Sequence, residues 1–186
     1  MSKVREIIFV LGGCRSGKSA HAQQIAENMP GNRKIYIATC VPQDDEMKQR
    51  VARHQRARGN HWLTVEAPLH LSQAITESIP KADVILVDCL TLWVSNLFME
   101  TNDEKQLEQT FSELTDTLEN TAGPVVLVSN EVGTGIVPEN RLARQYRDMI
   151  GLVNQAVANT ATRVIWTVAG IPVTIKGKTS RQIDRP

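Results

Sequence analysis

The 186-residue sequence lacks the features that mark several large classes of protein. Its formal net charge is only +1, so no overall field draws the chain to nucleic acid or to an anionic lipid surface. We therefore expect no nucleic-acid partner, and any basic site must be local. No apolar run approaches the roughly 20 residues that a membrane-spanning helix needs, which predicts no membrane insertion. The run Ile7–Leu11 is also too short for the core of a signal peptide.

Cysteine is scarce as well. The three cysteines, Cys14, Cys40 and Cys89, are far apart and form no C-x-x-C pair. Neither a disulfide framework nor a structural zinc site is indicated by this spacing. The simplest interpretation is that these are small residues of a protein in a reducing compartment, and we expect a cytoplasmic location.

The sequence does contain a series of short apolar runs rich in β-branched residues. Each run is nearly continuous rather than alternating, which is typical of strands covered on both faces in a parallel sheet. The predicted strands are Ile7–Leu11, Ile35–Ala38, Val84–Val87, Val125–Val128 and Val164–Val168. The predicted helices are Lys18–Met29, Asp45–Arg58, Leu69–Ile79, Leu90–Met99, Glu104–Asn120 and Glu139–Asn159. This alternation predicts one doubly wound α/β domain over residues 1–186.

The C-terminal region departs from this alternation. Gly170-Ile171-Pro172 breaks the chain before the apolar run Val173–Ile175, which we interpret as a last edge strand. The polar tail Gly177–Pro186 is expected to be loose.

The clearest motif is a phosphate loop. It fits G-x-x-x-x-G-K-[ST] at every fixed position and reads Gly12-Gly13-Cys14-Arg15-Ser16-Gly17-Lys18-Ser19. A predicted strand precedes it and a predicted helix follows, as the motif requires. The glycines let backbone N–H groups turn inward around phosphate oxygens, and the helix start adds its positive dipole end. Lys18 is predicted to contact the β- and γ-phosphates and Ser19 to ligate Mg²⁺, so the chain is expected to act on a nucleoside triphosphate.

A carboxylate follows the predicted strand Val84–Val87. Asp88 stands where phosphate-loop enzymes place the second acid that holds Mg²⁺, directly or through water. Taken alone, an aspartate at a strand end is more often a turn residue or a helix cap. Beside a phosphate loop, the metal role is the favoured interpretation.

The predicted helix Asp45–Arg58 carries a possible nucleophile. Spacing of three and four residues places Arg50, His54 and Arg58 on one face. Nearby cations keep a histidine neutral, and a neutral imidazole can attack phosphorus while arginines neutralise the phosphates. From spacing alone, a solvated basic helix with an incidental histidine is the simpler interpretation.

Together these residues resemble a known family, the bifunctional adenosylcobinamide kinase/adenosylcobinamide-phosphate guanylyltransferases of cobalamin biosynthesis. The resemblance runs from about residue 7 to residue 176. It rests on the phosphate loop, Tyr36-Ile37-Ala38-Thr39, Asp44-Asp45-Glu46-Met47 with Arg50, Val51 and His54, Trp62-x-Thr64-x-Glu66, Asp88-Cys89-Leu90-Thr91, Asn130-Glu131-Val132-Gly133-x-Gly135-Ile136-Val137-Pro138, Arg141-Leu142-Ala143-Arg144 and Arg147-Asp148. The phosphate loop is common to many families, whereas the blocks around His54 and Asn130 are much more specific.

The resemblance implies two reactions on one corrinoid substrate. A nucleoside triphosphate, GTP or ATP, phosphorylates adenosylcobinamide, and GMP is then transferred from GTP to give adenosylcobinamide-GDP and pyrophosphate. In this family a histidine carries the GMP covalently, and His54 is the matching position. The implied nucleotide contacts are the phosphate loop, Ala38, Thr39, Cys40, Gln55, Arg56, Ala57, Arg58, Glu66 and Asp88. The resemblance also implies a RecA-like, mostly parallel sheet with an antiparallel edge strand, and a homotrimer.

Base selection has to come from residues other than the familiar guanine motif. The sequence contains neither N-K-x-D, the guanine reader of small GTPases, nor the K-x-D-G of lysine-dependent guanylyltransferases. A carboxylate can accept hydrogen bonds from the guanine N1–H and amino group, which makes Glu66 the candidate. One departure from the family pattern is Cys14, where alanine is expected. Both are small and only the backbone N–H is needed there, so we expect activity to be retained.

The segment Asn130–Pro138 follows a predicted strand, so we expect it at the carboxyl end of the sheet, where α/β proteins bind ligands. It is either a plain strand-to-helix connection or a loop that faces the corrinoid or a neighbouring subunit. Pro138 is suited to start the next helix.

Three functions thus stay open at this point. The first is the bifunctional transferase. The second is a monofunctional kinase or NTPase, in which His54 is only part of a basic face. The third is a nucleotide-binding assembly or regulatory protein without catalysis.

Overall fold

The computed structural model of the chain describes residues 5–41, 45, 49, 59, 61–101 and 103–177. Its strands are β1 (Ile7–Gly12), β2 (Lys34–Ala38), β3 (Trp62–Glu66), β4 (Val84–Asp88), β5 (Val125–Asn130), β6 (Arg163–Val168) and β7 (Ile171–Lys176). Its helices are α1 (Lys18–Asn28), α3 (Leu71–Ser78), α4 (Leu90–Glu100), α5 (Glu104–Asn120) and α6 (Arg141–Thr160).

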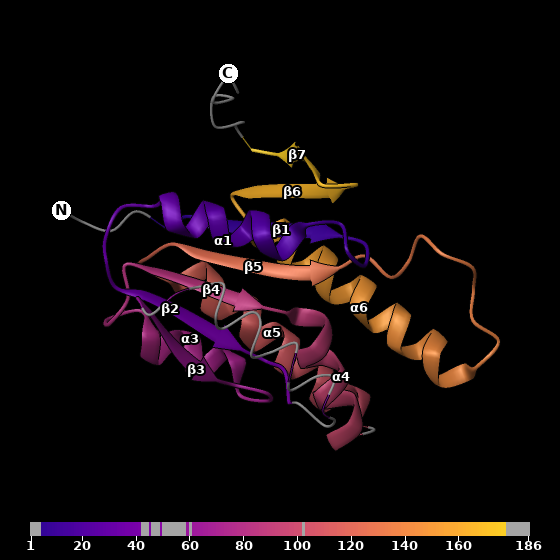
Figure 1. Cartoon of the computed structure of the whole chain (residues 1–186). Coiled ribbons are helices and arrows are strands. Elements are labelled where there is room, and N and C mark those ends of the chain that lie inside the picture. Colours follow the sequence, from indigo (N-terminus) through magenta and orange to yellow (C-terminus); the bar gives the residue numbers. More distant parts are fainter. Residues whose placement is uncertain are drawn as a thin grey trace.

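Within the described residues, all of these strands join one sheet in the order β3-β2-β4-β5-β1-β6-β7. Every neighbouring pair is parallel except β6 and β7, which pair antiparallel at one edge. Figure 1 shows the helices in two layers, with α1 on one side of the sheet and α3, α4, α5 and α6 on the other. The prediction of a mostly parallel sheet with an antiparallel edge strand is confirmed.

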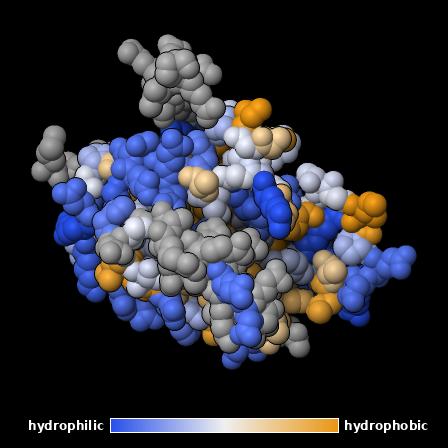
Figure 2. Space-filling model, in the orientation of Figure 1, coloured by the Kyte–Doolittle hydropathy of each residue, from blue (hydrophilic) through white to orange (hydrophobic). Residues whose placement is uncertain are grey.

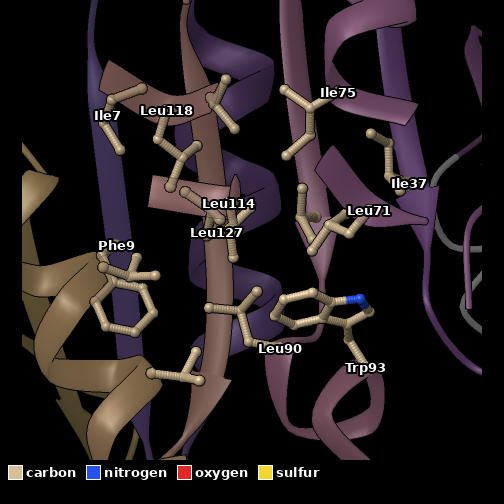
Figure 3. Close-up of a cluster of buried hydrophobic side chains, with 14 of the residues drawn as sticks. Ile7, Phe9, Ile37, Leu71, Ile75, Leu90, Trp93, Leu114, Leu118 and Leu127 are labelled. Atoms are coloured by element: carbon tan, nitrogen blue, oxygen red, sulfur yellow. The ribbon is translucent and has the colours of Figure 1, made fainter. Parts of the chain in front are cut away.

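The central strands are apolar over most of their length, and both of their faces are covered. Ile7, Phe9 and Leu127 point into the larger core between the sheet and helices α3–α6, where Trp93 of α4 is fully buried (Figure 3). Their neighbours Ile8 and Val10 point to the other face and pack against α1. The nearly continuous apolar runs in the sequence follow from this two-sided burial.

Helix α1 packs against the sheet through small residues, Ala22 and Ala26, while Lys18 at its start is also buried. Its buried positions are Lys18, Ala22 and Ala26, and its outer surface is largely hydrophilic in Figure 2. No helix within the described part of the chain is long and apolar enough to cross a membrane.

Strand β3 was not predicted from the sequence. It pairs with β2 at the edge of the sheet, and only Trp62 of its five residues is buried, while Leu63 is 59% exposed. An edge strand with one buried side chain leaves no continuous apolar run, which is the signal used for the others.

Some boundaries also differ from the predictions. Helix α6 begins at Arg141 rather than Glu139, because the side chain of Asn140 caps it by accepting hydrogen bonds from the N–H groups of Leu142 and Ala143. Pro138 therefore precedes the helix and does not start it. In the stretch predicted as helix Asp45–Arg58, Asp45 and Gln49 are helical and the other residues lie outside those described. The tail beyond residue 177 also lies outside them.

Candidate nucleotide site

The phosphate loop lies at the carboxyl end of the sheet, between β1 and α1, as predicted (Figure 1). Strand β1 is flanked by β5 and β6, and Gly12 at its end is in register with Asn130 on one side and Thr167 on the other. The N–H of Glu131 donates to the carbonyl oxygen of Gly12 at 3.1 Å. The loop thus begins at the end of a central strand, β1, and pairing with β5 and β6 holds this strand in place.

Two residues turn the loop tightly. Arg15 has φ 54° and Gly17 has φ 90°, the left-handed region that glycine enters at little cost. Gly17 also lies against the turn between β6 and β7. That turn binds the loop directly, because the N–H of Gly170 donates to the carbonyl oxygen of Ser16 at 3.0 Å. The loop is therefore braced from both the β5 and the β6 sides.

The ammonium of Lys18 is held inside the loop. Lys18 is 9% exposed, and its Nζ donates to the carbonyl oxygen of Gly13 at 3.1 Å. Helix α1 starts at Lys18 without a side-chain cap and without an acidic residue in its first turn. By contrast, Asp103 and Asn140 cap α5 and α6. An uncapped helix start next to a lysine is an arrangement suited to bind phosphate oxygens.

Asp88 is brought to the same end of the sheet. It is half-buried at the end of β4, next to Cys89. Burial raises the pKa of the Cys89 thiol to about 11, with the negative charge of Asp88 as the second cause and the Lys18 ammonium opposing it. Since both charges act on one thiol, the tertiary structure gathers the carboxylate and the loop lysine around Cys89, although 70 positions (88 − 18) separate them in the sequence.

The other predicted contacts lie along the neighbouring strand ends. Ala38 is the last residue of β2 and is in register with both Glu66 of β3 and Asp88 of β4. Glu66 is exposed, whereas Thr39 is fully buried and its hydroxyl is bonded to the backbone of Cys89. Cys40 is half-buried. His54, Gln55, Arg56, Ala57 and Arg58 lie outside the described residues.

A buried polar network beside the site was not predicted. The Thr91 hydroxyl accepts a hydrogen bond from the Asn130 amide at 2.7 Å, and the Thr91 carbonyl accepts one from the Tyr146 hydroxyl at 2.8 Å. The amide of Asn154 donates to the carbonyl oxygen of Asn130 at 3.2 Å. These bonds tie the start of α4 and the end of β5 to α6. Thr91 and Asn154 are buried polar residues, but nothing in their local sequence patterns shows that they meet.

The loop between β5 and α6 is exposed and is anchored by arginines. Arg147 donates to the carbonyl oxygen of Gly133 at 2.6 Å, and Arg144 donates to that of Pro138 at 2.9 Å. At its outer part, Ile136 is 97% exposed and Val137 is 62% exposed. Orange atoms mark this end of the molecule at the right of Figure 2. The structure therefore holds two apolar side chains out in solvent on a backbone that is itself tied down.

A phosphate loop at the end of a central parallel strand, with an aspartate at the end of β4, defines a P-loop nucleotide-binding protein. Solved structures agree on the fold. The flagellar accessory protein FlaH from Methanocaldococcus jannaschii matches with a TM-score of 0.53 at 14% identity, covering 95% of this chain and 80% of that one. The KaiC-like protein PH0186 from Pyrococcus horikoshii matches with a TM-score of 0.52 at 13% identity, covering 96% and 82%. The prediction of a RecA-like P-loop fold is confirmed.

Sequence comparison identifies the family. The model of the cobinamide kinase/cobinamide phosphate guanyltransferase family matches residues 8–175. The bifunctional adenosylcobalamin biosynthesis protein CobP of Pseudomonas aeruginosa is 41% identical over 170 residues, which cover 91% of this chain and 97% of that protein. The protein CobU of Salmonella typhimurium, with the same description, is 42% identical over 182 residues, covering 91% and 99%. The chain belongs to this family and is a bifunctional enzyme, a cobinamide kinase and cobinamide phosphate guanylyltransferase.

Proposed function

We propose that the chain phosphorylates adenosylcobinamide with a nucleoside triphosphate and then transfers GMP from GTP to that phosphate through a histidine–GMP intermediate on His54. The observation that carries the proposal is the phosphate loop with its buried Lys18, at the same end of the sheet as Asp88, in a chain of which residues 8–175 match a kinase and guanyltransferase family. The second step releases pyrophosphate and gives adenosylcobinamide-GDP.

The kinase step depends on the phosphate loop. Lys18 and the uncapped start of α1 bind the β- and γ-phosphates, and they neutralise the charge that develops as the γ-phosphoryl group moves. The hydroxyl of Ser19 and the carboxylate of Asp88 are the oxygen ligands for Mg²⁺. Both side chains are half-buried at the same end of the sheet, and a set of few hard oxygen donors suits an ion that keeps its phosphate ligands and several waters. When bound, Mg²⁺ supplies further neutralisation of the phosphate charge.

The guanylyl transfer proceeds by two displacements at the α-phosphorus of GTP. In the first, a ring nitrogen of His54 forms a bond to the α-phosphorus, and the bond to the bridging oxygen of the β-phosphate breaks, releasing pyrophosphate. In the second, an oxygen of adenosylcobinamide phosphate attacks the same phosphorus and the histidine leaves. Arg50 and Arg58, which the predicted helix would place on the same face as His54, neutralise the phosphates during both displacements.

Glu66 selects guanine in this proposal. Its exposed carboxylate stands at the end of β3, in register with Ala38, and it can accept hydrogen bonds from the guanine N1–H and amino group. GTP is therefore the donor in the second step, whereas ATP or GTP can serve the first. We further propose a cytoplasmic homotrimer, in which the loop between β5 and α6 faces the corrinoid or a neighbouring subunit.

The test is incubation with GTP labelled at the α-phosphorus. Label should stay on the protein, resist base and be lost in acid, because a phosphoramidate bond has that stability. His54→Ala should abolish the label, and Lys18→Ala should reduce it by weakening triphosphate binding. The exposed His61 offers a matched control, since His61→Ala removes another imidazole outside the proposed site.

Two results would contradict the proposal. If His54→Ala is labelled as strongly as the parent protein, the nucleophile is another residue. If even the parent protein carries no label, while adenosylcobinamide is still phosphorylated, the chain acts as a kinase alone. Chromatography of adenosylcobinamide incubated with GTP separates these outcomes, because it resolves the phosphorylated and the GDP-linked products.

A further inference from the structure

Helix α4 holds together the ends of two strands that carry the proposed guanine site. The amide nitrogen of Asn96 donates to the carbonyl oxygen of Thr39 at 2.8 Å and to that of Pro68 at 3.1 Å. Thr39 directly follows β2, and Pro68 is the second residue after β3. One side-chain NH₂ group, half-buried on α4, therefore joins the exits of both strands.

The chemistry of this contact requires an amide. Both partners are carbonyl oxygens, and an asparagine NH₂ group has two hydrogens to give. A carboxylate of the same shape would turn lone pairs toward both carbonyls and repel them. Asparagine is also a weak helix former, so its presence inside the largely apolar helix α4 is unfavourable for the helix itself. The two carbonyl contacts provide a physical reason for it.

Further bonds make this region rigid. One turn earlier on α4, the indole N–H of Trp93 donates to the carbonyl oxygen of Leu69 at 2.8 Å. The Thr39 hydroxyl donates to the carbonyl oxygen of Cys89 and accepts from its N–H, both at 2.8 Å. The N–H of Ala67 donates to the carbonyl oxygen of Ala38 at 2.8 Å. Glu66 lies between these fixed points, with its side chain exposed.

We infer that Asn96 is a positioning residue for base selection: it sets the place of Glu66 relative to the end of β2, and thereby the preference for guanine. This inference rests on the proposed role of Glu66. Asn96 itself touches no nucleotide in this account. It acts by holding Pro68, two residues beyond Glu66, at a fixed distance from Thr39.

The experiment compares equilibrium binding of GTP and of ITP, which lacks the amino group that Glu66 accepts from. Asn96→Asp keeps the shape and removes both donors, and Asn96→Ser shortens the side chain without adding charge. In both variants the ratio of GTP to ITP affinity should fall by at least about tenfold, the size expected when one hydrogen bond to a charged group is lost. Binding of inorganic tripolyphosphate, which uses the phosphate loop alone, should stay unchanged.

Two controls complete the design. Met99→Gln changes a residue of the same helix that is 74% exposed and should leave the ratio as in the parent. Glu66→Ala should lower the ratio of GTP to ITP affinity directly. Adding Asn96→Ser to Glu66→Ala should produce no further loss, because both substitutions act on the same contact between Glu66 and guanine.

An unchanged ratio in a folded Asn96 variant would overturn the inference. The inference would also be overturned if tripolyphosphate affinity fell by as large a factor as GTP affinity, since that indicates general damage to the fold. If Glu66→Ala leaves the ratio unchanged, then Glu66 does not select the base and the inference fails with it. The proposed function is judged separately, by the acid-labile label on His54, which this binding ratio does not involve.

Discussion

Gly12 and Gly13 are adjacent in the phosphate loop, yet the structure gives them opposite tolerance for a side chain. A Cβ on Gly12 would lie 2.6 Å from the carbonyl oxygen of Thr167 and would also overlap the hydroxyl of Ser16. A Cβ on Gly13 would have nothing within 4 Å. Neither glycine has a positive φ, so alanine fits the backbone conformation at both positions and the difference is one of space.

The expected cost follows from which neighbour can move. The Ser16 hydroxyl can rotate, but the Thr167 carbonyl belongs to β6, which is paired with both β1 and β7. The loop must therefore shift instead, and overpacking of this kind costs about 1–3 kcal/mol of the free energy of unfolding. Gly13→Ala should be neutral or more stable by about 0.4–1 kcal/mol, because alanine restricts the unfolded chain.

Urea unfolding and GTP binding measure the two consequences. Gly12→Ala should unfold at lower urea and bind GTP more weakly, since the backbone N–H groups that face the phosphates move with the loop. Gly13→Ala should match the parent protein in GTP binding. The reasoning would be refuted if Gly12→Ala were as stable as the parent and bound GTP equally well, or if the two variants behaved alike.

Two further predictions concern stability. Asn140→Ala removes the cap of α6 and should lower the free energy of unfolding, measured by urea unfolding, by about 0.5–2 kcal/mol. Asn159→Ala, near the other end of α6, should have a smaller effect. Equal effects of the two substitutions would contradict the capping role of Asn140. Burial, together with the positive charge of Arg163, lowers the pKa of His21 below 6.5. The unfolded chain therefore binds a proton before the folded protein does, and stability should fall as pH drops below 6.5. His21→Gln should lose less stability than the parent between pH 7.5 and pH 5.5, and parallel curves for the two proteins would exclude this cause.

The phosphate loop could be predicted because its chemistry is local. Eight consecutive residues supply the backbone N–H groups, the lysine and the hydroxyl, and the apolar run before them supplies the strand that positions them. The same holds for Asp88, which is the last residue of its strand. The family resemblance extended this to Ala38, Thr39, Cys40 and Glu66, which the structure places at the ends of β2 and β3 or directly after them. Their contacts with nucleotide stay predictions, as does the role of His54.

Contacts across the fold could not be predicted in this way. Asn96 and Thr39 are 57 residues apart, and Tyr146 and Thr91 are 55 residues apart. No periodicity or spacing relates such residues, since their side chains meet only when α4 and α6 pack on the same face of the sheet. Strand β3 was missed for a related reason, because its pairing with β2 and not its apolar content makes it a strand.

The sequence alone determined the class of fold, the phosphate loop and the family, because each depends on neighbouring residues or on the alternation of apolar runs with helices. The tertiary structure decided how the strand ends are held relative to one another. It determined which hydroxyls and amides form hydrogen bonds within the protein, which carboxylates stay exposed, and how α4 joins the ends of β2 and β3. Those arrangements depend on hydrogen bonds between segments distant in the chain, and such bonds form only once the sheet and its helices have packed.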